Sequence, residues 1–500
     1  MSVATVHLAD EAETIRFGED MARAVRPGDL IALSGDLGAG KSTFARALIR
    51  AMADDEFMEV PSPTFTLVQS YALRIPIAHF DLYRVADAAE LDELGLEEAL
   101  EDGVCLVEWP ERAEDALPAQ RLTLRFLHHG DGRLVEIDGP EPLAARVRRT
   151  LEIRAFLAGA GLADARRRHL TGDASIRAYE HVYAGGQRYV LMDSPRHTPG
   201  PILAHGKYYQ QIAHIAEDVR PFVAVAAHLG ARGLAAPAVF EKDLDRGILL
   251  IEDLGHDGVL DAEGRPIAER YLESVATLAE LHRQPVQETI PVGDGSDYRI
   301  PDFDLDAMQI EVSLLTDWYL PWKTGAAADT ATRDAYRGIW SDLVAGLETA
   351  ERNLLLRDFH SPNIIWRPQA SGIDCVGIID FQDAMIGPTA YDVASLVQDA
   401  RVDVPPELAS QMLEHYLGLR ETQGSGFDRN AFMAAWHVMA AQRNCKLVGI
   451  WVRLMQRDGK PAYMKHMPRT LENLRMALSH PRLAPLREWC GKAGILSDES

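Results

Sequence analysis

The sequence predicts two domains: an α/β domain built around a phosphate-binding loop, and a following α+β domain of two lobes. Three observations indicate this arrangement. A glycine-rich loop, GDLGAGKS, occupies residues 35–42. A segment with the spacing of a kinase catalytic loop, LRDFHSPN, occupies residues 356–363. The length of 500 residues also exceeds that of one ordinary hydrophobic core.

The composition is typical of a soluble globular protein, with 47% hydrophobic and 25% charged residues. No apolar run reaches the roughly 20 residues that span a bilayer. Residues 1–20 are acidic and lack the basic start and apolar centre of a signal peptide. We therefore expect a cytoplasmic protein with no membrane association.

The net charge of −24 disfavours extensive contacts with the phosphate backbone of a nucleic acid, so strong direct binding of nucleic acid is not expected. One local basic run, Arg166–His169, is predicted to be a solvated helix face. The four cysteines lie far apart and show no CxxC spacing, which predicts reduced structural cysteines.

The first domain is predicted to alternate helices and strands. Apolar periodicity predicts a helix over residues 9–24, and a buried strand over 30–34 leads directly into the glycine loop. A helix over 43–52 follows the loop, which is the context that a phosphate-binding loop requires. Further strands are expected at residues 65–71, 77–81, 104–108, 122–126 and 134–137, with an acidic helix at 88–100.

The sequence Pro140-Glu-Pro142 interrupts this pattern. We expect the first domain to cover residues 1–145, a linker helix to cover 146–165, and the second domain to cover 166–500. Within the second domain, a small β-rich lobe is predicted at about 166–255 and a helical lobe at about 256–500. A hairpin over 176–192, turning at Gly185-Gly186, opens the small lobe.

The residues of the glycine loop have a clear chemistry. Glycines let backbone N–H groups line a nest for phosphate, at the positive end of the next helix. Lys41 is expected to reach the β- and γ-phosphates of ATP, and Ser42 to bind Mg²⁺. Glu108 ends an apolar strand and is a second Mg²⁺ or water-positioning candidate. The loop glycines expected to bind nucleotide are Gly35, Gly38 and Gly40.

Three further segments of this domain form a set that is more specific than the glycine loop alone. They are SPTFT at residues 62–66, HFDLYR at 79–84 and VEWPE at 107–111. With GDLGAGKS, the set resembles TsaE, the bacterial ATPase of tRNA threonylcarbamoyladenosine biosynthesis, over about residues 5–140. The resemblance implies an α/β P-loop NTPase domain that works with the transferase subunits TsaB and TsaD, which hold the tRNA.

The same resemblance implies roles for single residues. Lys41, Ser42 and Thr43 match nucleotide-binding positions, and Asp81 and Glu108 match catalytic or other functional positions of that family. Trp109 also matches a functional position, and Thr64 lies in the switch-like segment.

The second domain carries the D-x-x-x-x-N spacing of kinase catalytic loops. Asp358 is expected to accept the proton of an attacking hydroxyl, and Asn363 to bind Mg²⁺. Leu356 stands where a histidine is usual. Seventeen residues after Asn363, the strand-like IIDFQ delivers Asp380 as the principal Mg²⁺ ligand.

The segment GPTAYDVASL at residues 387–396 resembles the aminoglycoside phosphotransferase superfamily. It implies an α+β kinase-like bilobal domain in which Asp392 braces the catalytic loop. The sequence lacks an APE-like segment and a long activation loop, which favours a small-molecule kinase over a protein kinase.

The segments expected to bind nucleotide in this domain differ from those of protein kinases. LTGDASIR at 170–177 has one glycine where a glycine-rich loop is usual, and Met192 replaces the phosphate-holding lysine. Gly172, Ser175 and Arg177 are the candidate nucleotide contacts there, and Glu252 lies in the expected adenine hinge.

Together TGDASIR, VLMDSP, IEDLG, LRDFHSPN and IDFQDA resemble the AmgK family of anomeric sugar kinases. That family phosphorylates N-acetylmuramate and N-acetylglucosamine in cell-wall recycling. The segment 431–457 contains Trp436, His437, Arg443, Lys446, Trp451 and Arg453. These residues could line a pocket for a sugar acid, because arginine pairs with a carboxylate and tryptophan stacks on a ring, but most of them are expected to be core or surface residues.

Other interpretations stay open on the sequence alone. The second domain could phosphorylate an aminoglycoside, choline or a homoserine-like substrate. It could also be a pseudokinase within a nucleotide-binding interaction module, because the lysine and histidine are replaced. The first domain could be an NTPase or kinase with no link to tRNA.

Overall fold

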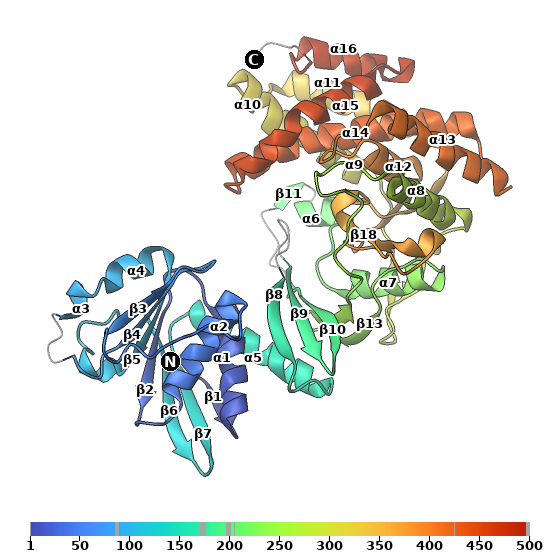
Figure 1. Cartoon of the computed structure of the whole chain (residues 1–500). Helices are drawn as coiled ribbons and strands as arrows, with labels where there is room; N and C mark the ends of the chain where they lie inside the picture. The colour runs from blue at the N-terminus through green and yellow to red at the C-terminus, as the bar shows by residue number, and fades with distance from the viewer. Residues whose placement is uncertain are drawn as a thin grey trace. The chain divides into compact units, whose positions relative to one another are not determined.

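The computed structural model describes residues 2–85, 90–170, 177–196, 202–204, 206–424 and 426–496. The chain divides into two compact units, Met1–Asp193 and Ser194–Ser500 (Figure 1). This division lies after the expected start of the second domain, because the chain from residue 143 to Asp193 packs with the first unit. The expected boundaries at 145, 165 and 255 remain predictions.

A seven-stranded mixed sheet forms the core of the first unit, in the order β1-β7-β6-β2-β5-β4-β3. Strand β2 pairs in parallel with β5 and β6, and β4 pairs in parallel with β5. The predicted strands of this domain are confirmed, although β3 is shorter than expected. The bounds are β1 (Ser2–Leu8), β2 (Leu30–Gly35), β3 (Val68–Tyr71), β4 (Ile77–Asp81), β5 (Val104–Glu108), β6 (Leu122–His129) and β7 (Gly132–Asp138).

Helices α1 (Glu11–Ala24) and α2 (Lys41–Ala53) pack on one face of this sheet and against each other. The rings of Phe17 and Phe44 lie 5.3 Å apart at this contact. Gly18 permits the close approach, since a Cβ there would lie 2.7 Å from the Cβ of Ala47. The short helices α3 (Glu90–Glu93) and α4 (Leu96–Asp102) precede β5.

Helix α5 (Leu143–Gly159) follows the sheet, at the place of the expected linker helix. Strands β8 (Arg166–Leu170), β9 (Ala178–Ala184) and β10 (Gln187–Asp193) then form an antiparallel meander. The predicted hairpin is confirmed, with its turn at Gly185-Gly186. The prediction of a solvated helix face at Arg166–His169 is wrong, because these residues form β8.

Arg167 on β8 is fully buried and held by carboxylates from two other elements. Its Nη1 lies 2.9 Å from Oδ1 of Asp20 on α1, and its Nε lies 2.7 Å from Oε2 of Glu180 on β9. Arg154 on α5 donates to the same Asp20 at 2.8 Å. These ion pairs join α1, α5, β8 and β9 at one point.

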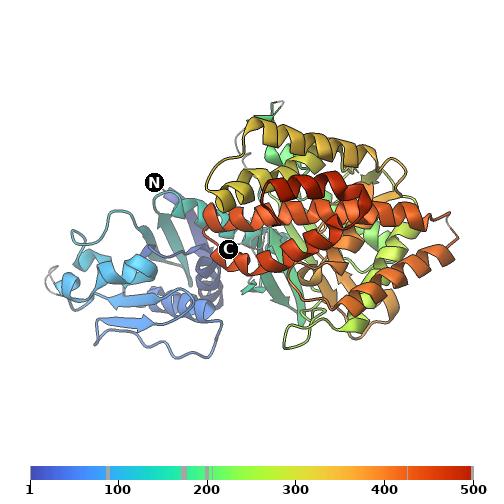
Figure 2. The same ribbon diagram turned by 90° about the horizontal axis from the view of Figure 1, so that it is seen from above.

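The second unit is mainly helical. Its helices are α6 (Tyr209–Ile212), α7 (Arg220–Ala231), α8 (Ala268–Arg283), α9 (Leu305–Leu314), α10 (Leu320–Thr324), α11 (Thr330–Ala345), α12 (Ala390–Val397), α13 (Pro406–Thr422), α14 (Arg429–Gln456), α15 (Met467–Leu478) and α16 (Ala484–Lys492). A π-helical turn, Leu315–Tyr319, separates α9 from α10. The long helix α14 packs against α9, α12 and α15, among the other helices of this unit (Figures 1 and 2). Its central residues are almost all buried.

Short hairpins interrupt the helices. They are β11 (Ile202–Ala204) with β12 (Lys207–Tyr208), β13 (Val239–Asp243) with β14 (Ile248–Glu252), β15 (Thr289–Pro291) with β16 (Asp297–Arg299), β17 (Arg352–Leu355) with β20 (Met385–Pro388), and β18 (Ile364–Trp366) with β19 (Val376–Ile378). The pairs β17–β20 and β18–β19 bracket the segment predicted to be catalytic. All four cysteines are free and buried, as expected. No described helix combines the length and hydropathy that crossing a membrane requires.

We predict that Arg167→Met destabilises the first unit by about 3–5 kcal/mol, because it leaves the buried carboxylates of Asp20 and Glu180 without their shared cation. Denaturant unfolding followed by circular dichroism measures the change. Arg125→Met is the matched control, since Arg125 forms an exposed pair with Glu136 worth at most about 1 kcal/mol. Equal stability of the two variants would contradict this role for Arg167.

Candidate active sites

The first candidate site is the loop between β2 and α2. Gly35, Gly38 and Gly40 have φ angles of 131°, 78° and 107°, which favour glycine. At Gly35 a Cβ would also lie 2.3 Å from the carbonyl oxygen of Phe126. The glycines are therefore required by backbone geometry, and they turn the loop back over the start of α2.

Lys41 opens α2 and folds over this loop. Its ammonium donates to the carbonyl oxygens of Gly35 at 2.5 Å and Asp36 at 2.9 Å. It also lies 3.8 Å from the centre of the Trp109 ring. Burial lowers the pKa of Lys41, against the opposing attraction of Glu108. The ammonium group is thus held at the loop, where a bound phosphate would compete with these carbonyl oxygens for its hydrogen bonds.

Ser42 and Glu108 come together as predicted. The Ser42 hydroxyl donates to Oε2 of Glu108 at 2.8 Å, and Nε2 of His79 lies 3.0 Å from Oε1 of the same carboxylate. Both residues are buried, Glu108 at the end of β5 and His79 in the middle of the neighbouring parallel strand β4. A hydroxyl beside a carboxylate, next to a phosphate-binding loop, is a donor set that suits Mg²⁺. Thr43 follows on α2, half-buried.

Asp81 ends β4 on the other side of Glu108. Its Oδ2 accepts from the hydroxyl of Thr64 at 3.0 Å, and its Oδ1 accepts from the backbone N–H of Tyr83 at 3.1 Å. The carboxylate therefore ties the segment 62–66 to the edge of the site. Trp109 adopts a left-handed φ of 59°, which turns its ring over Lys41.

One residue at this site was not anticipated. Arg133, on β7, donates from Nε to the carbonyl oxygen of Ala39 at 3.1 Å, inside the glycine loop. It reaches the loop because only β6 separates β7 from β2 in the sheet. No local spacing links residue 133 to residues 35–42, so no sequence pattern indicates this contact.

The second candidate site lies between β17 and β20. Asn363 donates from Nδ2 to the carbonyl oxygen of Asp358 at 2.9 Å and to Oδ2 of Asp380 at 3.3 Å. Gln382 donates to the other oxygen of Asp380 at 2.8 Å. The three predicted residues are thus brought together, and their oxygen atoms suit Mg²⁺ held jointly with phosphate. Asp380 has a left-handed φ of 59°.

Asp392 on α12 braces the catalytic loop, as the sequence indicated. It accepts from the backbone N–H of Leu356 and, at 3.0 Å, from that of Arg357. Burial raises the pKa of Asp392 to about 7, opposed by these hydrogen bonds. Arg357 has a left-handed φ of 69° and donates to Glu311 and to the carbonyl oxygen of Ala213. The loop geometry is therefore held from three elements.

Two cations from α14 set the charge around Asp358. Arg443 lies 3.8 Å from Oδ1 of Asp358 and donates to the carbonyl oxygen of Arg357 at 3.1 Å. Lys446 is paired with buried Glu311 at 2.8 Å. Burial alone would raise the pKa of Asp358, but Lys446 and Arg443 outweigh it and hold that pKa well below its usual range. Arg443 is a site residue, whereas His437 stacks on His480.

The expected nucleotide contacts of this site are only partly described. Gly172 and Ser175 lie outside the described residues. Arg177 lies half-buried immediately before β9. Glu252 ends β14, and its Oε2 accepts from the backbone N–H of Ala238 at 3.2 Å. Met192 is buried on β10 and brings no cation. Arg177 and Glu252 remain predictions.

Family comparisons agree with both sites. The TsaE model, described as a threonylcarbamoyl adenosine biosynthesis protein, matches residues 8–135, and the phosphotransferase enzyme family model matches residues 166–429. The chain belongs to both families. The predicted fold classes are therefore confirmed, and the chain is an enzyme that combines a TsaE-family ATPase with an ATP-using phosphotransferase.

Curated relatives cover the two parts separately. The chain is 34% identical over 348 residues to an N-acetylmuramate/N-acetylglucosamine kinase of Caulobacter vibrioides, covering 67% of this chain and 94% of that relative. It is 34% identical over 144 residues to TsaE of Haemophilus influenzae, covering 27% of this chain and 90% of that relative.

Solved structures also match each part. YdiB of Bacillus subtilis aligns at 27% identity over 30% of this chain and 95% of that chain, with a TM-score of 0.26. A microcompartment-associated aminopropanol kinase aligns at 14% identity over 69% of this chain and 99% of that chain, with a TM-score of 0.43.

We predict that acceptor phosphorylation keeps its kcat/KM down to about pH 5, because Asp358 stays ionised there. Arg443→Gln removes one of the cations that lower the pKa of Asp358, so the acidic limb of the profile should move up by about one pH unit or more. A pH series of kcat/KM measures this. Arg457→Gln, at the exposed end of α14, should leave the profile unchanged. An unshifted limb in Arg443→Gln would contradict the assignment.

Proposed function

We propose that the second site transfers the γ-phosphoryl group of ATP to the anomeric hydroxyl of N-acetylmuramate or N-acetylglucosamine. The observation that carries this proposal is the Asp358, Asn363 and Asp380 cluster, in a chain that covers almost all of the Caulobacter kinase of that name.

In this mechanism Asp358 orients the attacking hydroxyl and accepts its proton. Asn363 and Asp380 would hold Mg²⁺, which supplies positive charge to the phosphates when bound. Arg443 keeps the Asp358 carboxylate ionised and braces the loop through Arg357. A carboxylate with a lowered pKa is a weak base. It suits an anomeric hydroxyl, which is more acidic than an ordinary alcohol.

The charge near Asp358 weighs against the other substrates. Arg443 lies 3.8 Å from the catalytic carboxylate, and Lys446 and Arg357, which pair with Glu311, also attract it. An aminoglycoside or choline would bring further positive charge to these cations. The carboxylate of N-acetylmuramate would instead bring negative charge. A catalytically silent domain is also disfavoured, because Asp358, Asn363 and Asp380 keep the arrangement that phosphoryl transfer needs.

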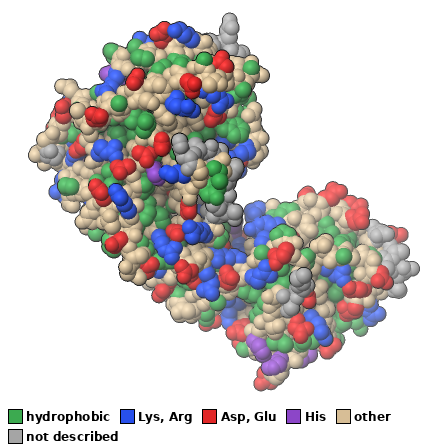
Figure 3. All heavy atoms as spheres, turned by 180° about the vertical axis from the view of Figure 1, so that it is seen from behind, with side chains coloured by type: hydrophobic (Ala, Val, Ile, Leu, Met, Phe, Trp, Pro, Cys, Tyr) green, Lys and Arg blue, Asp and Glu red, His purple; other side chains and the backbone are tan. Residues whose placement is uncertain are grey.

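We propose that the first site hydrolyses ATP in support of tRNA threonylcarbamoyladenosine synthesis in the cytoplasm, with TsaB and TsaD as partners. Ser42 and Glu108 would hold Mg²⁺, Lys41 the phosphates, and Asp81 the neighbouring segment. Acidic and basic side chains are interspersed on the visible face in Figure 3, without a continuous basic surface. This pattern supports indirect contact with tRNA through the partner subunits.

The kinase proposal predicts that wild type converts N-acetylmuramate and N-acetylglucosamine to their phosphates but leaves methyl N-acetylglucosaminide, whose anomeric hydroxyl is blocked, unchanged. Mass spectrometry of the products measures this. Asp358→Asn should lower the rate at least about a hundredfold, because the proton acceptor is lost. Phosphorylation of the methyl glycoside at the same rate would exclude the anomeric hydroxyl. Phosphorylation of kanamycin alone would favour an aminoglycoside kinase.

The ATPase proposal predicts that the chain restores threonylcarbamoyladenosine formation to TsaB, TsaD and tRNA over many turnovers. Glu108→Gln keeps the side-chain shape but removes the charge beside Ser42, so repeated turnover should fall about 10²-fold or more. Modified nucleoside is counted after digestion of the tRNA. Glu114→Gln, exposed and paired with Arg121, is the control and should behave as wild type. Full turnover by Glu108→Gln would refute this role.

A further inference from the structure

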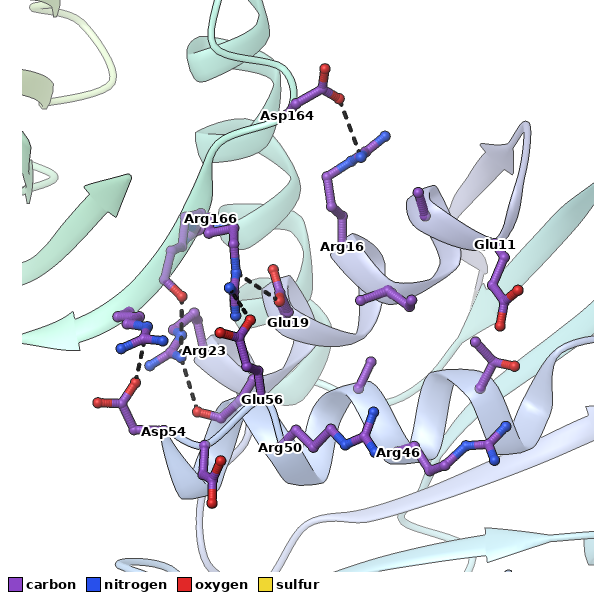
Figure 4. A pocket seen from close by; sticks show the side chains of 18 residues that line it. Glu11, Arg16, Glu19, Arg23, Arg46, Arg50, Asp54, Glu56, Asp164 and Arg166 are labelled. Atoms are coloured by element: carbon purple, nitrogen blue, oxygen red, sulfur yellow. Dashed lines mark hydrogen bonds and ion pairs between the residues drawn. The ribbon is translucent and has the colours of Figure 1, made fainter. Parts of the chain in front are cut away.

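A cavity of about 590 Å³ lies between α1, α2 and β8 in the first unit (Figure 4). Its volume falls in the range of about 300–1,000 Å³ that small-molecule sites occupy. One wall is the face of α2 from Thr43 to Ala51, and the opposite wall is formed by Arg166, Arg167 and Arg168 of β8. It is separate from the loop carbonyls that hold Lys41.

The two walls come from the two families that the chain joins. Helices α1 and α2 lie within residues 8–135, which match TsaE, and β8 begins at residue 166, where the phosphotransferase match begins. A protein with only one of these parts would have only one wall. The cavity is therefore a product of the fusion.

Arginine dominates the lining. Four of its arginines are paired with carboxylates: Arg16 with Asp164, Arg166 with Glu19, Arg167 with Asp20, and Arg168 with Asp54. The other three, which are Arg23, Arg46 and Arg50, form no ion pair with the residues that the structure describes. The cavity thus holds three guanidinium groups without carboxylate partners.

These three groups have unused hydrogen-bond donors. Arg46 makes no hydrogen bond within the described part of the chain, and Arg50 donates only Nε, to the carbonyl oxygen of Met58 at 2.9 Å. They lie one helical turn apart and side by side on α2 (Figure 4). Arg23 donates Nη2 to two carbonyl oxygens, while its Nε is buried without a partner. Burying the Nε of Arg23 without an acceptor is costly, and an anion bound in the cavity would supply one.

We propose that this cavity binds a small phosphorylated molecule, whose phosphate is held by Arg23, Arg46 and Arg50. Planar guanidinium groups match phosphate oxygens in paired, charge-assisted hydrogen bonds. A compact ligand is favoured over RNA, because carboxylates such as Glu11, Asp55 and Glu56 also line the cavity and repel an extended polyanion. The ligand would contact α2, the helix that begins with Lys41. The proposal does not depend on which sugar the second site uses.

Isothermal titration of the full-length chain tests this site, with inorganic phosphate and glucose 6-phosphate, a sugar phosphate that is not the proposed product of the second site, as probes. Saturating Mg·ADP occupies the two nucleotide sites during the titration. Wild type should bind at least one probe saturably with one-to-one stoichiometry, and Arg46→Ala/Arg50→Ala should bind it at least about tenfold more weakly. Arg265→Ala/Arg283→Ala, which removes two exposed arginines of the second unit, should bind as wild type.

Binding of both probes would show that phosphate alone suffices, and binding of the sugar phosphate alone would show that the sugar adds contacts. Either result supports the site if the α2 double variant weakens it. The proposal is overturned if neither probe binds wild type, or if the double variant binds as tightly as wild type. Should the double variant fail to fold, the single Arg46→Ala decides, because Arg46 has no hydrogen-bond or ion-pair partner to lose among the described residues.

Discussion

The ion pairs of Arg167 are the interaction on which the first unit depends. A guanidinium without solvent exposure is tolerable only when carboxylates surround it, and Asp20 and Glu180 supply them from α1 and β9. Because α1 packs on α2, and α2 begins with Lys41, the position of β8 is linked to that of the phosphate-binding loop. The start of the phosphotransferase region, from β8 to β10, belongs to the same compact unit as the ATPase region.

Each site must hold one charged side chain in position for phosphate chemistry, and the two sites do so with different contacts. In the first, the ammonium of Lys41 rests on loop carbonyl oxygens and the Trp109 ring. In the second, Asp358 rests near Arg443, and Asp392 fixes the backbone beneath it. Non-glycine residues with left-handed φ, such as Arg357 and Asp380, occur at these points because the surrounding contacts impose the conformation.

Much of both sites could be predicted because their residues are close in sequence or end regular strands. The glycine loop is contiguous, and Asp358, Asn363 and Asp380 have a fixed spacing across one short hairpin. Arg133 could not be predicted, and Arg443 could be named only as one of six candidates on one helical segment, since each reaches its loop only through sheet order or helix packing. The burial of Arg167 was likewise missed, because a run of three arginines indicates a solvated surface until its carboxylate partners, far away in sequence, are known.

A crossed assay of both activities tests whether the chain holds two separate active sites. Wild type, Lys41→Ala and Asp358→Asn would each be given Mg·ATP, N-acetylglucosamine, TsaB, TsaD and tRNA, and both sugar phosphate and modified nucleoside would be counted. We expect Lys41→Ala to lose only tRNA modification and Asp358→Asn to lose only sugar phosphate. Loss of sugar phosphate in Lys41→Ala, or of both products in either variant, would contradict two separate active sites.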